Sequence, residues 1–279
     1  MAAPEALQRG SSAIVIARQV RSDIEAGRYR HEEQLPSTRT LAEEWRTSVA
    51  TITRAMQQLA EQGLVINRDR SSRVVNYPDP RSWDRGAPTV LVVGGYAGSG
   101  KTETGRVMAR LTGWPMLDKD STTRPVVEAA LSKLGLSPHD RESETYLDVV
   151  RPAEYEALRM VTMENVACRN SAIMTAPHIR ELRDSAWCER LAAELDAAGA
   201  AMHAVWVRCD PESMRTYIVR RGAARDAHKL AHWDEYVNGL DLDYTPATPH
   251  TIISNSIASP PLQPQIEQLL GRLGAPVRR

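Results

Sequence analysis

Apolar residues near the start of the chain recur at the spacing of an α-helix. Ile16, Val20 and Ile24 lie four residues apart, which predicts an amphipathic helix over residues 13–26 that ends at Gly27. Two shorter apolar faces follow, formed by Leu41, Ala42 and Trp45 and then by Val49, Ile52, Met56 and Leu59. Two such helices joined by a tight turn have the geometry of a helix-turn-helix.

Serine residues stand just before the second and third of these helices. The hydroxyls of Ser37 and Ser48 can accept hydrogen bonds from the amides that a helix start leaves without a partner. Beyond the third helix, the apolar runs 64–66 and 73–75 flank a polar, basic segment and predict two strands joined by a tip. We therefore expect a winged helix-turn-helix domain, mostly α-helical with a β wing.

The pattern changes after a segment rich in proline. Residues 77–88 contain three prolines and a glycine without periodicity, which is typical of a linker. Beyond it, apolar runs suited to buried strands alternate with amphipathic helices, the pattern of an α/β domain with a parallel sheet. The expected strands lie at residues 89–95, just before Asp118, and at 171–176, 202–208 and 250–254. We predict a winged-helix domain over residues 1–77, a linker over 78–88 and an α/β domain over 89–279.

Composition narrows the class of protein. Apolar residues make up 42% and charged residues 25% of the 279 positions, as in a globular protein with a proper core. The 3 cysteines are widely spaced, which argues against a disulfide framework or a zinc site and fits a reducing cytoplasm. No apolar run reaches the roughly 18 residues that a membrane span needs. We expect a cytoplasmic protein that does not enter a membrane.

Charge is divided unevenly, although the formal net charge is +0. Residues 1–86 hold 13 arginines, no lysine and 11 acidic residues. This excess is too small to identify a nucleic-acid-binding protein by itself. A preference for arginine over lysine fits contact with DNA, and a GC-rich genome would produce the same bias.

The most informative motif follows the first expected strand of the α/β domain and opens a helix. It reads Gly95-Tyr-Ala-Gly-Ser-Gly-Lys101-Thr102, the pattern G-x-x-x-x-G-K-T in which a loop wraps its amides around phosphate groups. Lys101 is expected to reach the β- and γ-phosphates and the Thr102 hydroxyl to bind Mg²⁺, while the helix start adds partial positive charge. The loop residues assigned to the phosphates are Gly95, Gly98, Ser99 and Gly100. The sequence therefore predicts a P-loop that binds ATP, or another nucleoside triphosphate, with Mg²⁺.

Two carboxylates, Asp118 and Asp120, lie near the end of the second expected strand, at the edge where open α/β sheets bind ligands. One could orient or deprotonate a substrate hydroxyl, and the other could hold Mg²⁺ through water. We assign Asp120 to the first task and Asp118 to the metal. The third expected strand ends at Thr175-Ala-Pro177 without the acid that usually stands there. A polar strand end or a helix cap is the alternative explanation for the two carboxylates.

Arginines follow the fourth expected strand. Arg220, Arg221 and Arg225 are spaced along a helix and the loop after it, where they could close over a triphosphate. Arg220 is expected to bind the nucleotide, and Arg221 and Arg225 to neutralise charge on a transferred phosphoryl group. Each of them could instead be a solvated surface charge.

The first region resembles a known family of DNA-binding proteins. The run LPSTRTLAEEWRTSVATITRAMQQLAEQGLV is similar to the DNA-binding domain of GntR-type regulators. The resemblance implies that Arg39 contacts the DNA backbone and that the third helix enters the major groove. The implied contacts on that helix and on the wing are Ser48, Ala50, Thr51, Arg54, Arg70 and Arg73. It also implies a homodimer on a double-stranded DNA operator.

Residues 89–260 resemble the small P-loop phosphotransferases, among them polynucleotide 5′-kinase, gluconate and shikimate kinases and antibiotic kinases. The resemblance implies that Asp120 serves as a base and that Arg124 contacts the substrate. It assigns Arg220, Arg221 and Arg225 to the lid that closes over the triphosphate. It also places residues 139–142 and 151–155 in an insert that covers the acceptor of the phosphoryl group.

Two functions of different classes follow. In the first, the chain is a GntR-type transcriptional regulator whose P-loop domain binds Mg²⁺ and ATP as effector or co-substrate. In the second, it is an active small-molecule kinase whose winged helix serves autoregulation. A kinase that processes nucleic-acid ends is a less economical third hypothesis. Whether the chain is an enzyme stays open at this point.

Overall fold

The computed structural model describes residues 12–68, 72–77, 86–223 and 226–277. The chain divides into two compact units, Met1–Gly86 and Ala87–Arg279. Each unit has its own hydrophobic core.

The first unit contains three helices, α1 (Ala13–Glu25), α2 (Thr38–Glu44) and α3 (Val49–Glu61). Their apolar faces meet in one core to which α1 contributes Ile16, Val20 and Ile24 and α3 contributes Ile52, Met56 and Leu59. Both predicted caps are confirmed. The Ser37 hydroxyl accepts from the Thr40 amide at 3.1 Å, and the Ser48 hydroxyl accepts from the Thr51 amide at 3.1 Å.

A two-stranded antiparallel wing completes this unit. It consists of β1 (Val65–Asn67) and β2 (Arg73–Val75), in which Val65 pairs with Val75. The first strand lies one residue later than the sequence pattern indicated. The tip, with Arg70, lies outside the described residues. The first unit is therefore a winged helix-turn-helix, as predicted.

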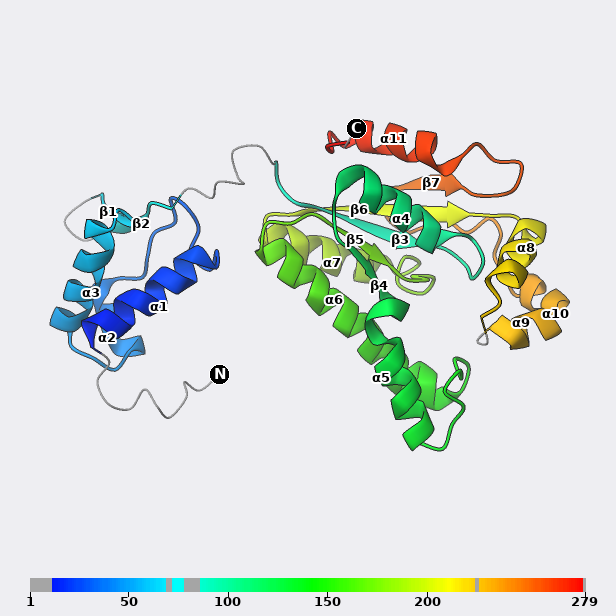
Figure 1. The fold of residues 1–279 in the computed structure, drawn as a ribbon, viewed down its shortest axis with the longest axis horizontal. Helices are drawn as coiled ribbons and strands as arrows, with labels where there is room; N and C mark the ends of the chain where they lie inside the picture. Colours follow the sequence, from blue (N-terminus) through cyan, green and yellow to red (C-terminus); the bar gives the residue numbers. More distant parts are fainter. Residues whose placement is uncertain (1–11, 69–71, 78–85, 224–225, 278–279) are drawn as a thin grey trace. The chain divides into compact units, whose positions relative to one another are not determined.

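The second unit is built on a parallel sheet of five strands (Figure 1). They are β3 (Thr89–Gly94), β4 (Met116–Asp118), β5 (Ala172–Thr175), β6 (Ala201–Arg208) and β7 (His250–Ser254), in the order β4-β5-β3-β6-β7. The central strand, β3, is buried on both faces, which explains its uninterrupted apolar sequence.

Helices cover both faces of this sheet (Figure 1). Val90 and Val92 of β3 face the core formed with α6 (Arg151–Ala167) and α7 (Ser185–Ala197), whereas Leu91 and Val93 face α4 (Lys101–Thr112) and α11 (Leu262–Arg272). The remaining helical segments are α5 (Lys119–Lys133), a π-helical turn (Tyr146–Val150), α8 (Pro211–Arg221), α9 (Ala227–Ala231) and α10 (Trp233–Asn238).

The topology brings the carboxyl ends of all five parallel strands to one edge of the sheet. The P-loop follows β3 there, and the two predicted carboxylates follow β4, so both motifs lie where such sheets bind ligands. No helix in the described part of the chain has the length and apolar character needed to cross a bilayer.

Candidate functional site

The loop between β3 and α4 is shaped by two glycines with a left-handed backbone. Gly98 has a φ of +82° and Gly100 a φ of +88°, and L side chains rarely adopt such angles. A Cβ atom at Gly98 would lie 2.8 Å from the Met214 carbonyl oxygen, and one at Gly100 would collide with the Asn255 side chain. Asn255, just beyond β7, donates from Nδ2 to the Ser99 carbonyl oxygen at 2.9 Å. The end of β7 therefore holds the loop in a form that requires glycine.

This loop offers hydrogen-bonding groups to a ligand. The Ser99 hydroxyl is not one of these groups, because its side chain is completely buried and lies beside Gly95, behind the loop. No side chain caps α4, which begins at Lys101, so its first amides are open to an anion. Lys101 Nζ lies 3.5 Å from the Tyr96 carbonyl oxygen, across the same loop. The loop shaped by Gly98 and Gly100, called here the glycine cradle, and the uncapped helix start together fit a chain of phosphate groups.

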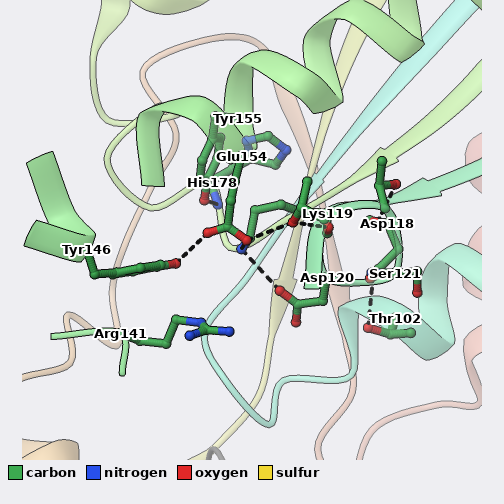
Figure 2. Close-up of polar contacts among 12 residues, drawn as sticks. Thr102, Asp118, Lys119, Asp120, Ser121, Arg141, Tyr146, Glu154, Tyr155 and His178 are labelled. Carbon is green, nitrogen blue, oxygen red and sulfur yellow. Dashed lines mark hydrogen bonds and ion pairs between the residues drawn. The ribbon is translucent and has the colours of Figure 1, made fainter. Parts of the chain in front are cut away.

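Thr102 and Asp118 meet beside this cradle (Figure 2). Thr102 Oγ1 lies 3.4 Å from Asp118 Oδ2, while Asp118 Oδ1 accepts from the Ser121 amide at 3.0 Å and caps α5. Asp118 is thus a helix cap with one oxygen still facing Thr102. In the described part of the chain no cluster of three or more His, Cys, Asp or Glu side chains is arranged to hold a metal. A magnesium ion would therefore depend on this pair and on phosphate oxygens, which suits a hard cation.

A cavity of about 700 Å³, called here the P-loop cavity, opens in front of the cradle. The sequence-predicted residues that line it are Gly98, Gly100, Lys101, Thr102, Asp118, Asp120, Arg124, Arg220 and Arg221. Gly95 and Ser99 lie buried behind them. Arg225 lies outside the described residues. Residues predicted from separate parts of the sequence are therefore brought together around one cavity.

The lid arginine Arg221 has an ion-pair partner that the sequence did not reveal. It extends from the last turn of α8 and donates to Asp226 Oδ2 from Nε at 2.9 Å and from Nη2 at 2.5 Å. The Asp226 side chain is buried. This carboxylate fixes the direction of the guanidinium.

A second cavity, of about 580 Å³, adjoins the first. Lys101, Asp120 and Arg221 line both cavities. Its other walls include Arg141 and Arg151, which come from the two segments that the kinase resemblance places over an acceptor.

Lys119, between the two predicted carboxylates, is the centre of a buried polar network (Figure 2). Its Nζ lies 2.8 Å from Glu154 Oε1 and 3.1 Å from Asp120 Oδ1. Glu154 also accepts from Thr123 Oγ1 at 2.8 Å and from the Tyr146 hydroxyl at 2.7 Å. Burial, reinforced by Glu154, raises the pKa of Tyr146 far above its ordinary value, so this hydroxyl stays a donor. The network ties Asp120 to the insert between β4 and β5.

His178 follows β5, beyond the place where the missing strand-end acid would stand. Its ring is completely buried, and neither ring nitrogen has a hydrogen-bond partner among the described residues. It packs edge-on against Tyr155 at 5.4 Å between ring centroids. Burial, with the positive charges of Arg151, Lys101 and Lys119, lowers the pKa of His178 to about 3. The imidazole is therefore neutral at physiological pH.

Four of the residues predicted to contact DNA are exposed on the helix-turn-helix, and one of them, Ser48, also caps a helix. The Arg39 side chain is 86% exposed and pairs with Glu43 at 3.3 Å. Ala50 and Arg54 are exposed on α3. These side chains are open to a ligand in the first unit.

Ser48 and the remaining predicted DNA contacts have roles inside the unit. The Ser48 hydroxyl caps α3 and lies 2.8 Å from Thr51 Oγ1. Arg73 donates from Nη1 to Thr38 Oγ1 at 2.7 Å, which fastens the wing to α2. Arg70 lies outside the described residues. For Ser48, Thr51 and Arg73 the structure thus supplies a stabilising task, and DNA contact by them stays a prediction.

Comparison with known proteins identifies both units. Residues 90–242 match the family described as AAA domain, and this match covers more than half of the 279 residues. The chain belongs to the AAA domain family. Residues 13–75 match the family of bacterial regulatory proteins named gntR, so the AAA domain protein has a GntR domain at its N-terminus and a P-loop kinase-like domain after it.

Solved structures similar to this AAA domain protein include kinases. A sugar kinase from a Janibacter species has 17% sequence identity, covers 68% of this chain and 95% of its own, and gives a TM-score of 0.44. A gluconokinase from Sinorhizobium meliloti has 17% identity with the same coverages and a TM-score of 0.40. The GntR-family transcription factor YtrA from Sulfolobus acidocaldarius has 25% identity over 27% of this chain and 80% of its own, with a TM-score of 0.24. No curated protein matches the sequence.

Besides Asp226, sequence reasoning missed three further residues that build the site. Asn255 acts on the P-loop from 156 positions away, and no motif marks it. Lys119 and Glu154 pair across 35 positions. The available signal was a lysine directly between two aspartates; the structure shows that this lysine is buried, and a buried lysine needs an acidic partner.

Proposed function

We propose that this chain is a DNA-binding regulator of the GntR type whose second unit binds ATP, or another nucleoside triphosphate, with Mg²⁺ in the P-loop cavity. The observation that carries the proposal is the shaped P-loop, with its glycine cradle and uncapped helix start, on the same chain as a GntR domain. In this proposal Lys101 neutralises the β- and γ-phosphates. Thr102 and Asp118 hold the metal or its water, and Arg220 contacts the nucleotide.

A nucleotide can change DNA affinity only if it binds one arrangement of the protein better than another. The same coupling then makes DNA change the affinity for nucleotide by the same factor. The first unit supplies exposed Arg39 and Arg54 for DNA, and we propose a homodimer on two half-sites, as helix-turn-helix proteins commonly bind.

The test measures affinity for a DNA duplex, selected in vitro by the nucleotide-free protein, with and without saturating Mg²⁺ and ATP. Coupling between the sites should change the wild-type affinity by at least about fivefold. Lys101→Ala should abolish this change, whereas the matched variant Lys133→Ala, an exposed lysine that lines neither cavity, should retain it. Equal DNA affinity of the wild type with and without ATP would contradict the regulator proposal.

A second candidate function, phosphoryl transfer, is favoured by one observation: Lys101, Asp120 and Arg221 line both cavities. Residues shared in this way would lie between a phosphoryl donor in the P-loop cavity and an acceptor in the second cavity. Asp120 would accept the proton of a hydroxyl on the acceptor molecule. The oxygen of that hydroxyl would form a bond to the γ-phosphorus, while the bond between the γ-phosphorus and the β–γ bridging oxygen breaks and ADP leaves. Lys101 and Arg221 would neutralise the charge that develops on the transferred group.

Turnover against a panel of hydroxylated metabolites tests this second function. Asp120→Asn should lower the rate by about 100-fold if Asp120 is the base, and Asp196→Asn, on the exposed surface of α7, should leave it unchanged. Transfer to no acceptor, while ATP still changes DNA affinity, would reject phosphoryl transfer and leave the regulator proposal standing.

A further inference from the structure

The second cavity has a marked excess of positive charge. Eight basic side chains and three acidic ones line it. Four of the basic side chains form ion pairs inside the protein. These pairs are Lys119 with Glu154, Arg151 with Glu181, Arg183 with Asp241 and Arg221 with Asp226. Arg141 and Arg180, which line the same cavity, form no such ion pair with another described residue.

Arg141 is held in place without a direct ion pair among the described residues, although the pKa of the neighbouring Asp140 carboxyl is lowered by the hydrogen bond from the Glu142 amide and, in addition, by the Arg141 charge. Its guanidinium lies 5.1 Å from the centre of the Tyr146 ring, and Nη1 donates to the carbonyl oxygens of Pro138 at 3.2 Å and Asp140 at 2.5 Å. The Asp140 carboxylate instead accepts from the Glu142 amide at 2.9 Å. An aromatic face and carbonyl oxygens orient a guanidinium but carry no full negative charge. Figure 2 shows the Arg141 guanidinium directed toward the side on which Asp120 lies.

Arg180 adds a second cation to the same cavity. It lies in the turn after β5, its side chain is exposed, and no carboxylate of the described residues pairs with it. Two guanidiniums on one cavity wall without a direct ion pair raise the local positive potential, which favours an anionic ligand there. Planar guanidiniums bind carboxylate and phosphate oxygens in pairs, which makes these groups the fitting counter-charge.

We propose that the second cavity binds a small hydroxylated molecule that carries an oxyanion, a carboxylate or a phosphate, and that Arg141 and Arg180 hold this oxyanion. The proposal rests on the second candidate function, because it names the class of acceptor for phosphoryl transfer. The oxyanion at Arg141 and Arg180 leaves the hydroxyl of the same molecule free to reach Asp120, which the two cavities share.

Matched pairs of ligands test the charge requirement by binding alone, without turnover. The probes are gluconate beside sorbitol for the carboxylate, and glycerol 3-phosphate beside glycerol for the phosphate. Calorimetry on the full chain is done with the P-loop filled by Mg²⁺ and a non-hydrolysable ATP analogue, so that the phosphate probe does not occupy the P-loop. A charge-assisted pair of hydrogen bonds should make the anion of at least one pair bind at least about tenfold more tightly than its neutral partner.

Substitutions of arginine test whether the preference for the anion depends on Arg141. Arg141→Gln should weaken anion binding about tenfold and leave binding of the ATP analogue unchanged. The control Arg110→Gln, on an exposed position of α4 that lines neither cavity, should bind as the wild type does. Neutral partners that bind as tightly as the anions, no binding by either anion, or full affinity in Arg141→Gln would each overturn the proposal.

Failure of this proposal and failure of nucleotide binding can be told apart. The gluconate and sorbitol pair is also measured without nucleotide and in Lys101→Ala. If the ATP analogue does not bind but gluconate still binds through Arg141, the P-loop assignment fails and the acceptor class stands. If the analogue binds and gluconate and glycerol 3-phosphate do not, the acceptor class fails alone.

Discussion

The burial of His178 predicts a defined dependence of stability on pH. Its ring is inaccessible and lacks a hydrogen-bond partner among the described residues, and its pKa is lowered to about 3. In an unfolded chain a histidine has a pKa of about 6.5. Between these two values the unfolded state binds one more proton than the folded state, so stability is lost as the pH falls from about 6.5 toward 3.

The expected size of this loss is large relative to the stability of a typical domain. From pH 7 to pH 5, the linkage relation gives about 2 kcal/mol less stability of the second unit from His178 alone. The replacement His178→Asn removes the titrating group. Asparagine is suitable because residue 178 has a φ of +49°, which asparagine tolerates better than most residues. The variant should be less stable at pH 7 but should lose about 2 kcal/mol less than the wild type on going to pH 5.

The protein is unfolded in urea at pH 7 and at pH 5, and unfolding is monitored by hydrogen exchange of the backbone amides in peptides from β3 and β6. Because both strands belong to the second unit, this measurement reports on that unit by itself. The control His31→Asn changes a histidine of the first unit and should follow the wild type. If wild type and His178→Asn lose the same free energy between the two pH values, the ring is already protonated or hydrogen-bonded in the folded protein, and this account of His178 is wrong.

Three further substitutions test the proposed metal site, the buried network around Lys119 and the cap of α3. Asp118→Asn keeps a residue able to cap α5 but removes a negative charge near Mg²⁺. The factor by which Mg²⁺ increases nucleotide affinity should therefore fall by about tenfold. An unchanged factor in a magnesium titration would show that Asp118 is not part of the metal site. Glu154→Gln leaves the buried Lys119 with one acidic partner and should destabilise the second unit by about 3 kcal/mol in urea, and a loss below 1 kcal/mol would contradict a tight network. Ser48→Ala should cost the first unit about 1 kcal/mol through the lost cap, and a thermal midpoint equal to that of the wild type would show that the cap is unimportant.

Local chemistry was predictable from the sequence. The P-loop is specified within eight consecutive positions, and Ser37 and Ser48 precede the helices that they cap. These signals depend on hydrogen bonds between neighbouring residues, which the sequence places directly. The apolar runs likewise predicted the strands of the parallel sheet, because β3 and its neighbours are buried on both faces.

Contacts between distant segments were not predictable in this way. Asn255 reaches the P-loop because β7 ends beside it, and Glu154 reaches Lys119 because α6 packs on α5. Both contacts depend on the order of strands and the packing of helices, which a single sequence does not specify. The contact of Arg73 within the first unit was not predictable for the same reason. Only the fold shows that the Arg73 guanidinium lies 2.7 Å from Thr38 Oγ1.

The central claim is that the P-loop cavity binds a nucleoside triphosphate with Mg²⁺ through Lys101. The most direct measurement is calorimetric titration of the full chain with ATP, with and without Mg²⁺, for the wild type and Lys101→Ala. The account predicts one nucleotide per chain, tighter binding with Mg²⁺, and a loss of at least about tenfold in affinity in Lys101→Ala, because a charged contact to phosphate is removed. No binding by the wild type, or equal affinity in Lys101→Ala, would contradict it.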